Sequence, residues 1–170
     1  MTESHNSPAT RQHIEKTPIE AFKDEVNRAT AMRYLPVDSF AREDGHAYRL
    51  AKAFGDDLKA TQLRRFFGVI KHAERHMRST VVESKESVQD ATAEAMLDDQ
   101  TRTNLALLMP VLAYAKARKL IPGGFYDIMK MCMGPTRLKS EADLERFTQF
   151  MEALVAYHKL FEKGSRDHQG

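Results

Sequence analysis

Hydrophobic residues recur every three or four positions along most of this chain, a spacing that places them on one face of an α-helix. No segment shows the strict alternation of hydrophobic and polar residues that is typical of a strand. The pattern predicts helices over residues 17–33, 47–54, 61–78, 103–120, 125–133 and 140–161, and residues 83–98 are compatible with a further, acidic helix. We therefore expect an all-α fold, a compact bundle of about five or six helices in a single domain.

Capping residues mark the start of three of these helices. Thr17 precedes Pro18 at the first helical position, and Thr61 is expected to be the N-cap of its helix. Ser140 has Asp143 at the offset of a capping box. Such side chains accept hydrogen bonds from the first free backbone N–H groups of a helix, so they predict where a helix begins.

Proline and glycine predict where the helices end. Pro36 follows the first helix, Gly55 follows the second, and the Pro-Gly-Gly run at 122–124 is expected to stop the helix over residues 103–120. Because that helix is hydrophobic nearly all round, we expect it to be the buried central helix. Pro110 lies inside it and either kinks it or begins a new helix.

The composition limits what else the chain can be. We expect residues 1–16 to be a disordered tail, residues 17–162 the helical domain and residues 163–170 a frayed end. No hydrophobic run approaches the roughly 18 residues of a membrane span. The first residues also lack the hydrophobic stretch of a secretory signal, so we expect a cytoplasmic protein without a membrane partner. The single cysteine, Cys132, excludes an internal disulfide and a cysteine-type zinc site.

Charge is distributed in blocks along the chain, although the net charge is only +2. Residues 58–79 have a net charge of +5, residues 83–99 of −5 and residues 116–139 of +5. Such blocks indicate either basic surface for a polyanion or neighbouring helices of opposite sign that pair with each other. The charges alone favour neither explanation.

The helix over residues 61–78 separates its hydrophobic and basic residues most clearly. Its core-facing arc is Leu63, Phe66, Ile70, Ala73 and Met77. A narrow basic ridge lies away from that arc and comprises Arg64, Lys71, Arg75 and Arg78, with Arg65, His72 and His76 on its flank. The ridge would extend about 21 Å. It is either a surface for a nucleic-acid backbone or the solvated face of an amphipathic helix.

The sequence predicts no catalytic residue, metal site or cofactor. His72 and His76 are spaced like two zinc ligands, but a third ligand and a correctly placed glutamate are missing, so surface histidines are the better interpretation. Cys132 is expected to be a core residue, because burial raises the pKa of a thiol and makes it unreactive. His158, within a hydrophobic arc, is expected to be a core histidine with one hydrogen-bond partner.

Three separated segments resemble the small helical subunit of type III-A CRISPR effector complexes, the Csm complexes. Residues 61–67 (TQLRRFF) are similar to its T-S/T-Q-L-R-K-F helix start, and residues 112–118 (LAYAKAR) to its L-A-Y-x-x-G-R. Residues 147–161, with MEALVAYHK at 151–159, resemble its C-terminal F-x-x-F-x-E-A-L-V-A-Y-H-K helix, the most specific of the three. The resemblance covers residues 58–162 and departs from the family at Ala117, where glycine is usual.

The resemblance implies a non-catalytic subunit that lines the groove holding guide RNA and target RNA. It contacts the RNA backbone without reading sequence, and it assembles with the backbone subunit, the large subunit and copies of itself. The motifs carry over four RNA-contact candidates: Arg64, Arg65, Arg118 and Lys159. The ridge adds three more: Lys71, Arg75 and Arg78.

The resemblance also assigns Tyr157 and Glu152 to packing and to polar contacts between helices. The acidic residues 83–99 would repel RNA, so they are expected to face a protein partner or solvent. The alternative hypothesis is a helical interaction protein that dimerises through the hydrophobic arc of its C-terminal helix and does not bind nucleic acid.

Overall fold

A computed structural model describes residues 15–87 and 94–162, with the backbone alone given for residues 83–87. The described residues form α-helices and short 3-10 helices, and their only β contact is an isolated bridge between Met96 and Ser140. The all-α bundle is therefore confirmed. Its elements are α1 (Pro18–Ala29), η1 (Met32–Tyr34), α2 (Val37–Ala41), α3 (His46–Phe54), η2 (Gly55–Asp57), α4 (Ala60–Ser87), α5 (Asp99–Ala117), α6 (Gly123–Cys132) and α7 (Glu141–Phe161). Of the predicted tails, residues 1–14 and 163–170 lie outside the described residues, whereas Lys16 is described and its Nζ lies 2.5 Å from Asp24 of α1.

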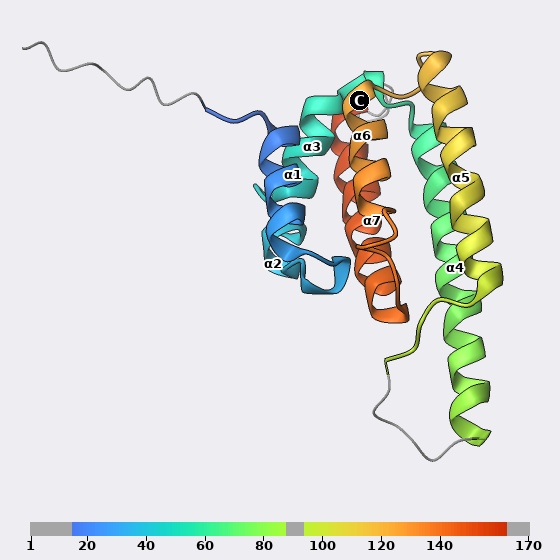
Figure 1. Cartoon of the computed structure of the whole chain (residues 1–170). Helices are drawn as coiled ribbons and strands as arrows, with labels where there is room; N and C mark the ends of the chain where they lie inside the picture. The colour runs from blue at the N-terminus through green and yellow to red at the C-terminus, as the bar shows by residue number, and fades with distance from the viewer. Residues whose placement is uncertain (1–14, 88–93, 163–170) are drawn as a thin grey trace, which may run out of the picture.

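The C-terminal helix α7 forms the centre of the bundle. It packs against α3, α4, η1 and α2, while α5 packs on α4 and α6 (Figure 1). Aromatic rings fill the space around it, with Phe150 stacked on Phe22 at 4.4 Å between ring centroids and edge-on to Phe40 at 5.8 Å. The hydrophobic arc of α7 is thus buried within the chain, so it cannot be the dimer surface of the alternative hypothesis.

The first helix is shorter than the sequence predicts. Thr17 caps α1 as expected, and with Glu20 it forms a complete capping box. The helix ends at Ala29 and not near Arg33, because Thr30 adopts a left-handed φ of 65° that breaks the helical hydrogen-bond series. The short helices η1 and α2 follow, and α2 was not predicted from the sequence.

The fourth helix is longer than predicted at both ends. It begins at Ala60, so Thr61 lies in its first turn and is not the N-cap. It continues past Arg78 to Ser87, and Figure 1 shows its last turns extending beyond the other helices. Val81 is buried, so the core contact that holds the helix continues beyond the predicted end.

The acidic segment does not form the separate helix that its composition allowed. Residues 83–87 belong to α4, and residues 88–93 lie outside the described residues. From Glu94 to Leu97 the chain is extended, and the Leu97 N–H donates to the Lys139 carbonyl over 2.9 Å. Asp98 then caps α5 by accepting from the Thr101 N–H at 2.6 Å.

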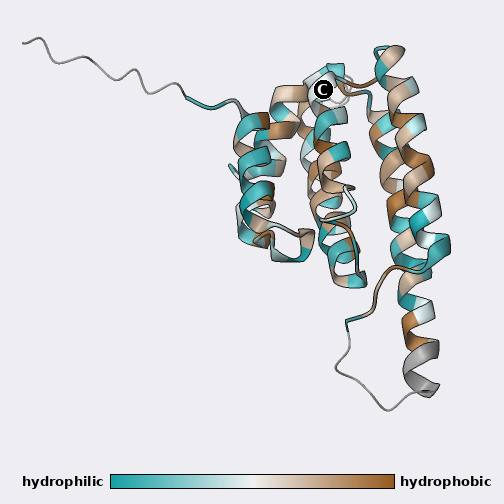
Figure 2. Ribbon diagram, viewed as in Figure 1, coloured by the Kyte–Doolittle hydropathy of each residue, from teal (hydrophilic) through white to brown (hydrophobic). Residues whose placement is uncertain are grey.

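The hydrophobic helix α5 lies on the outside of the bundle and not at its centre. Figure 2 shows hydrophobic positions along most of its length. Leu107 and Tyr114 nevertheless keep 62% and 64% of their surface exposed. Pro110 does not end the helix, which runs through it without a break. The nearly uniform hydrophobicity of α5 therefore leaves an exposed hydrophobic face that burial in this chain does not account for.

The Pro-Gly-Gly run at 122–124 begins a helix as well as ending the one before. Pro122 is the N-cap of α6, and the two glycines are its first residues. Gly124 packs so tightly against α1 that a Cβ at this position would clash with the side chain of Ile19. The predicted stop is therefore displaced, because α5 already ends at Ala117.

A buried carboxylate joins the start of α7 to the N-terminal half of the chain. Asp143 is fully buried and forms the predicted capping box with Ser140. Its oxygens also accept from the Arg33 N–H at 3.0 Å and the Lys139 N–H at 3.1 Å. The Arg33 guanidinium reaches out from there to Glu94. One side chain thus accepts hydrogen bonds from backbone N–H groups of η1 and of the loop before α7.

Other side chains of α7 fix it to α2 and η2. The Tyr157 hydroxyl donates to the Ala41 carbonyl at 2.7 Å, which confirms its packing role. Glu152 is exposed and has no hydrogen-bond or ion-pair partner among the described side chains, so the prediction of a helix–helix contact is wrong there. His158 is buried, and its Nε2 donates to the Gly55 carbonyl at 2.9 Å, as expected of a core histidine.

Candidate nucleic-acid interface

The basic ridge of α4 is an exposed helix face opposite a continuous core stripe. Leu63, Phe66, Ile70, Ala73 and Met77 are all buried, which confirms the predicted core-facing arc. Arg64, Arg75 and Arg78 are exposed and Lys71 is half-buried. Over these 14 residues the helix rises about 21 Å. The structure therefore presents the ridge as predicted, along one side of a straight element.

A buried glutamate holds two cations of the ridge. Glu74 is only 5% exposed, and its carboxylate lies 2.9 Å from Lys71 Nζ and 3.1 Å from an Arg78 guanidinium nitrogen. Arg78 also reaches Glu145 of α7 at 3.5 Å. Because a buried carboxylate without a partner is costly, Lys71 and Arg78 are committed to this site first. The sequence contained the signal, since the three residues are spaced i,i+3 and i,i+4.

Two cations that come from different helices meet at a second carboxylate. Glu162, just after α7, lies 3.6 Å from Arg64 of α4 and 2.8 Å from Lys159 of α7. The hydrogen bond from Lys159, helped by the charges of Lys159 and Arg64, lowers the pKa of Glu162 below its ordinary value. Two positive charges share one negative charge here, so this end of the ridge keeps a net positive charge.

Arg65 and Arg75 are exposed and have no carboxylate within ion-pair distance among the side chains that the structure describes. Arg75 belongs to the ridge, beside the hollow that it lines with Arg78 and Val82. Arg65 lies on the flank and faces α5. Their full charges are therefore available to an anion from outside the chain.

A groove lies between α4 and α5, and we call it the α4–α5 groove. Its main lining residues are Arg65, Gly68, Val69, His72, Asn104 and Leu107. None of its lining side chains is a carboxylate. This groove was not predicted from the sequence, although Val69 and Leu107 are hydrophobic residues outside the core arcs and could have indicated it.

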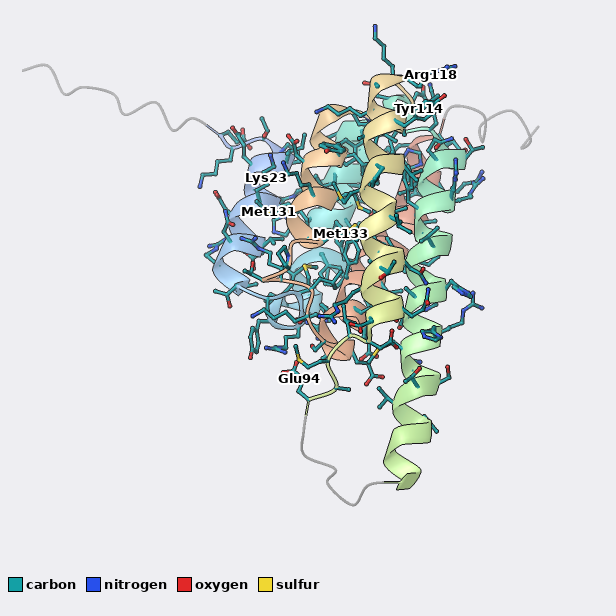
Figure 3. The ribbon with its side chains drawn as sticks, turned by 45° about the vertical axis from the view of Figure 1, so that its right-hand side comes forward. Lys23, Glu94, Tyr114, Arg118, Met131 and Met133 are labelled. Atoms are coloured by element: carbon teal, nitrogen blue, oxygen red, sulfur yellow. The ribbon has the colours of Figure 1, made fainter. Side chains whose placement is uncertain are left out.

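Arg118 is apart from the ridge. It follows the last residue of α5, Ala117, and its guanidinium carbon lies 5.9 Å from the centre of the Tyr114 ring. Figure 3 shows the two residues together at the C-terminal end of α5. The structure therefore brings Arg64 and Lys159 together and aligns the ridge, but it places Arg118 at a separate position.

Of the residues considered for chemistry, Cys132 and His76 have contacts within the fold, whereas His72 is exposed. Cys132 is fully buried, and this burial raises the pKa of its thiol to about 12. His76 lies 3.4 Å from Asp98 at the start of α5, whereas His72 lines the α4–α5 groove. Within the described ranges, no three His, Cys, Asp or Glu side chains are grouped so that they could hold a metal ion.

Comparisons with known proteins bear on the identity of the chain. Across the described helices, none combines the length and the hydrophobicity needed to cross a membrane. Searches of curated proteins and of solved structures find no significant match. A family model described as Csm2 Type III-A matches residues 39–164, which include α3 to α7 and all seven RNA-contact candidates. The chain therefore belongs to the Csm2 family, the small subunits of type III-A CRISPR Csm complexes.

Proposed function

We propose that this chain lies along the guide RNA and its paired target RNA in the cytoplasm and contacts their backbones without reading sequence. In this role it is a non-catalytic subunit, and it assembles with the backbone subunit, the large subunit and further copies of itself. The ridge of α4, together with Lys159, supplies the contact surface.

The observation that carries the proposal is the convergence of Arg64 and Lys159 on Glu162. The two cations come from motifs almost a hundred residues apart, yet they form one cluster with excess positive charge. Ion pairs between exposed side chains are worth only about 0–1 kcal/mol, so a phosphate can take over either cation at little cost. Phosphate contacts of this kind give binding that is insensitive to sequence.

The ion pairs of the ridge suggest how much each candidate residue contributes to RNA binding. Arg75 and Arg65 have no described carboxylate partner, and Arg64 shares one with Lys159. Lys71 and Arg78 are held by the buried Glu74. We therefore expect Arg64, Arg75 and Lys159 to contribute most to RNA binding, and Lys71 and Arg78 to contribute less.

The state of the reactive side chains supports a non-catalytic role. The Cys132 thiol stays protonated because it is buried, and a thiol is nucleophilic only as the thiolate. His158 donates its Nε2 proton to a backbone carbonyl inside the core. Neither side chain is accessible to a substrate.

The test is a filter-binding titration of RNA over a range of salt concentrations. Arg64→Ala combined with Arg75→Ala should weaken binding and reduce the slope of log K against log salt by about 0.7–0.9 for each phosphate that the variant no longer neutralises. Both side chains are exposed, so the variant should unfold at the parent's midpoint.

A matched control removes the same charge elsewhere. Arg28→Ala combined with Lys130→Ala takes two exposed cations from α1 and α6, away from the ridge. This control should keep the parent's slope. Equal slopes for the parent and both double variants would contradict the proposal.

A further inference from the structure

The α4–α5 groove combines hydrophobic and cationic side chains that the fold does not use. Val69 and Leu107 keep 36% and 62% of their surface exposed. Arg65 and His72 stand on the α4 wall, and no carboxylate lines the groove. A groove of this composition is complementary to a ligand with negative charge and with flat or hydrophobic parts.

Gly68 points to an occupant from outside the chain. It lies in the interior of α4, where glycine destabilises a helix relative to alanine. Apart from the helix backbone around it, no atom lies within 4 Å of the place that a Cβ at Gly68 would take. Packing within the chain therefore does not require the glycine, but it keeps one wall of the groove flat.

An exposed aromatic ring lies on α5 beyond the residues that line the groove, toward the C-terminal end of the helix. Tyr114 follows Leu107 by seven residues, which places it on the same face of α5 and about 10.5 Å further along the axis. Its ring is 64% exposed and has the Arg118 guanidinium beside it (Figure 3). The Lys59 N–H donates to the Leu120 carbonyl over 3.2 Å, so this end of α5 lies next to the start of α4.

We propose that the α4–α5 groove binds a single RNA strand, with one base stacked on Tyr114 beside Arg118 and a phosphate at Arg65. An exposed ring next to a cationic groove is the arrangement by which proteins hold single-stranded nucleic acid without reading its sequence. The inference rests on the proposed function and adds to it, because the ridge contacts phosphates only whereas this groove also contacts a base.

The charge of the groove favours RNA over a protein partner. A hydrophobic peptide would leave the charge of Arg65 without a counter-ion, whereas the RNA backbone supplies one at each nucleotide. The guanidinium of Arg118 lies over one face of the Tyr114 ring, so the base is expected on the opposite face, where the ring stays exposed.

The test compares two labelled probes on the full chain: a short oligouridine and an abasic oligonucleotide with the same number of phosphates. Tyr114→Ala should bind oligouridine about 5- to 150-fold more weakly, the range expected when one base stack is removed. Its affinity for the abasic probe should equal the parent's. Tyr114→Phe keeps a ring and should bind both probes as the parent does.

A second variant fills the groove from the α4 side. Gly68→Leu meets nothing at its Cβ and replaces a weak helix former, so its thermal midpoint should equal or exceed the parent's. Its affinity for oligouridine should fall, because the side chain occupies the flat wall.

Several results would overturn the inference. The inference fails if Tyr114→Ala binds oligouridine as tightly as the parent does. It also fails if the affinity of this variant for the abasic probe falls by the same factor as its affinity for oligouridine. Tyr114→Ala could also bind RNA normally but fail to enter the assembled complex, which would make the groove a protein surface. If binding depends on Arg64 and Arg75 but not on Tyr114, this inference fails and the proposed function stands. If the parent binds neither probe at low salt, both fail.

Discussion

The surroundings of Asp143 and the α4–α5 groove with its neighbouring ridge differ in how far their side chains are paired within the chain. Around Asp143, a carboxylate with no exposed surface is saturated by backbone N–H groups and by the Ser140 hydroxyl. Along the α4–α5 groove and the ridge of α4, Tyr114 and Leu107 are exposed, Arg65 and Arg75 have no described counter-ion, and Gly68 weakens a helix by about 0.5–1 kcal/mol.

The difference separates folding from binding. Both carboxylate oxygens of Asp143 find their hydrogen-bond partners within the chain, so that region serves to fix α7 against η1 and the loop before it. The groove and the ridge instead carry one exposed aromatic ring, an exposed leucine, two cations without a described counter-ion and a glycine that packing within the chain does not require. The glycine costs helix stability and the exposed side chains add little to stability inside the chain, so we propose that this surface serves a partner outside it.

The largest expected effect is a loss of stability when the Asp143 carboxylate is removed. Asp143→Ala leaves several buried N–H groups without an acceptor and should lower the free energy of unfolding by on the order of 3–5 kcal/mol. Chemical denaturation measures this loss. Glu152→Ala is the matched control, because Glu152 is an exposed acid of the same helix, and it should stay within about 0.5 kcal/mol of the parent. Similar small losses for both variants would show that the two regions do not differ as described.

A smaller effect is expected in the pH dependence of the thermal stability. Burial beside the Phe22 ring lowers the pKa of His46 below its ordinary value, so the folded state favours the neutral imidazole. The unfolded chain therefore binds more protons as the pH falls through the ordinary histidine range, and stability should fall with it. The thermal midpoint of the parent should drop between about pH 7.5 and about pH 5.5.

The control for this measurement replaces histidines one at a time. His46→Gln should reduce the drop in midpoint, since the group that titrates unfavourably in the folded state is gone. His72→Gln removes an exposed histidine of α4 and should leave the drop as in the parent. A drop that is unchanged in His46→Gln would assign the pH dependence to another group.

The sequence predicted the elements that depend on local patterns. The N-cap of α1 and the capping box of α7 are formed as expected, and the core arc of α4 is buried as its spacing indicated. These features depend on residues three or four positions apart, so they can be read directly from the chain. The core positions of Cys132 and His158 followed from their hydrophobic neighbours in the same way.

What the sequence could not predict depends on contacts between distant residues. Burial of one face does not follow from hydrophobicity alone, so α5 was expected at the centre although Leu107 and Tyr114 are exposed. The pairing of Arg64 with Glu162 joins residues far apart in the chain. The spacing of Lys71, Glu74 and Arg78 already allowed their ion pairs. That these ion pairs are costly to break follows from the burial of Glu74, which the sequence does not show.

The most direct measurement is photo-crosslinking of the assembled type III-A complex, loaded with guide and target RNA that carry thiouridine, followed by mass spectrometry of this chain. If the ridge of α4 lies on the RNA backbone, the crosslinked peptides will come from α4 and from the end of α7 near Lys159. Crosslinks confined to α1 or α3, or to neighbouring subunits alone, would contradict the account.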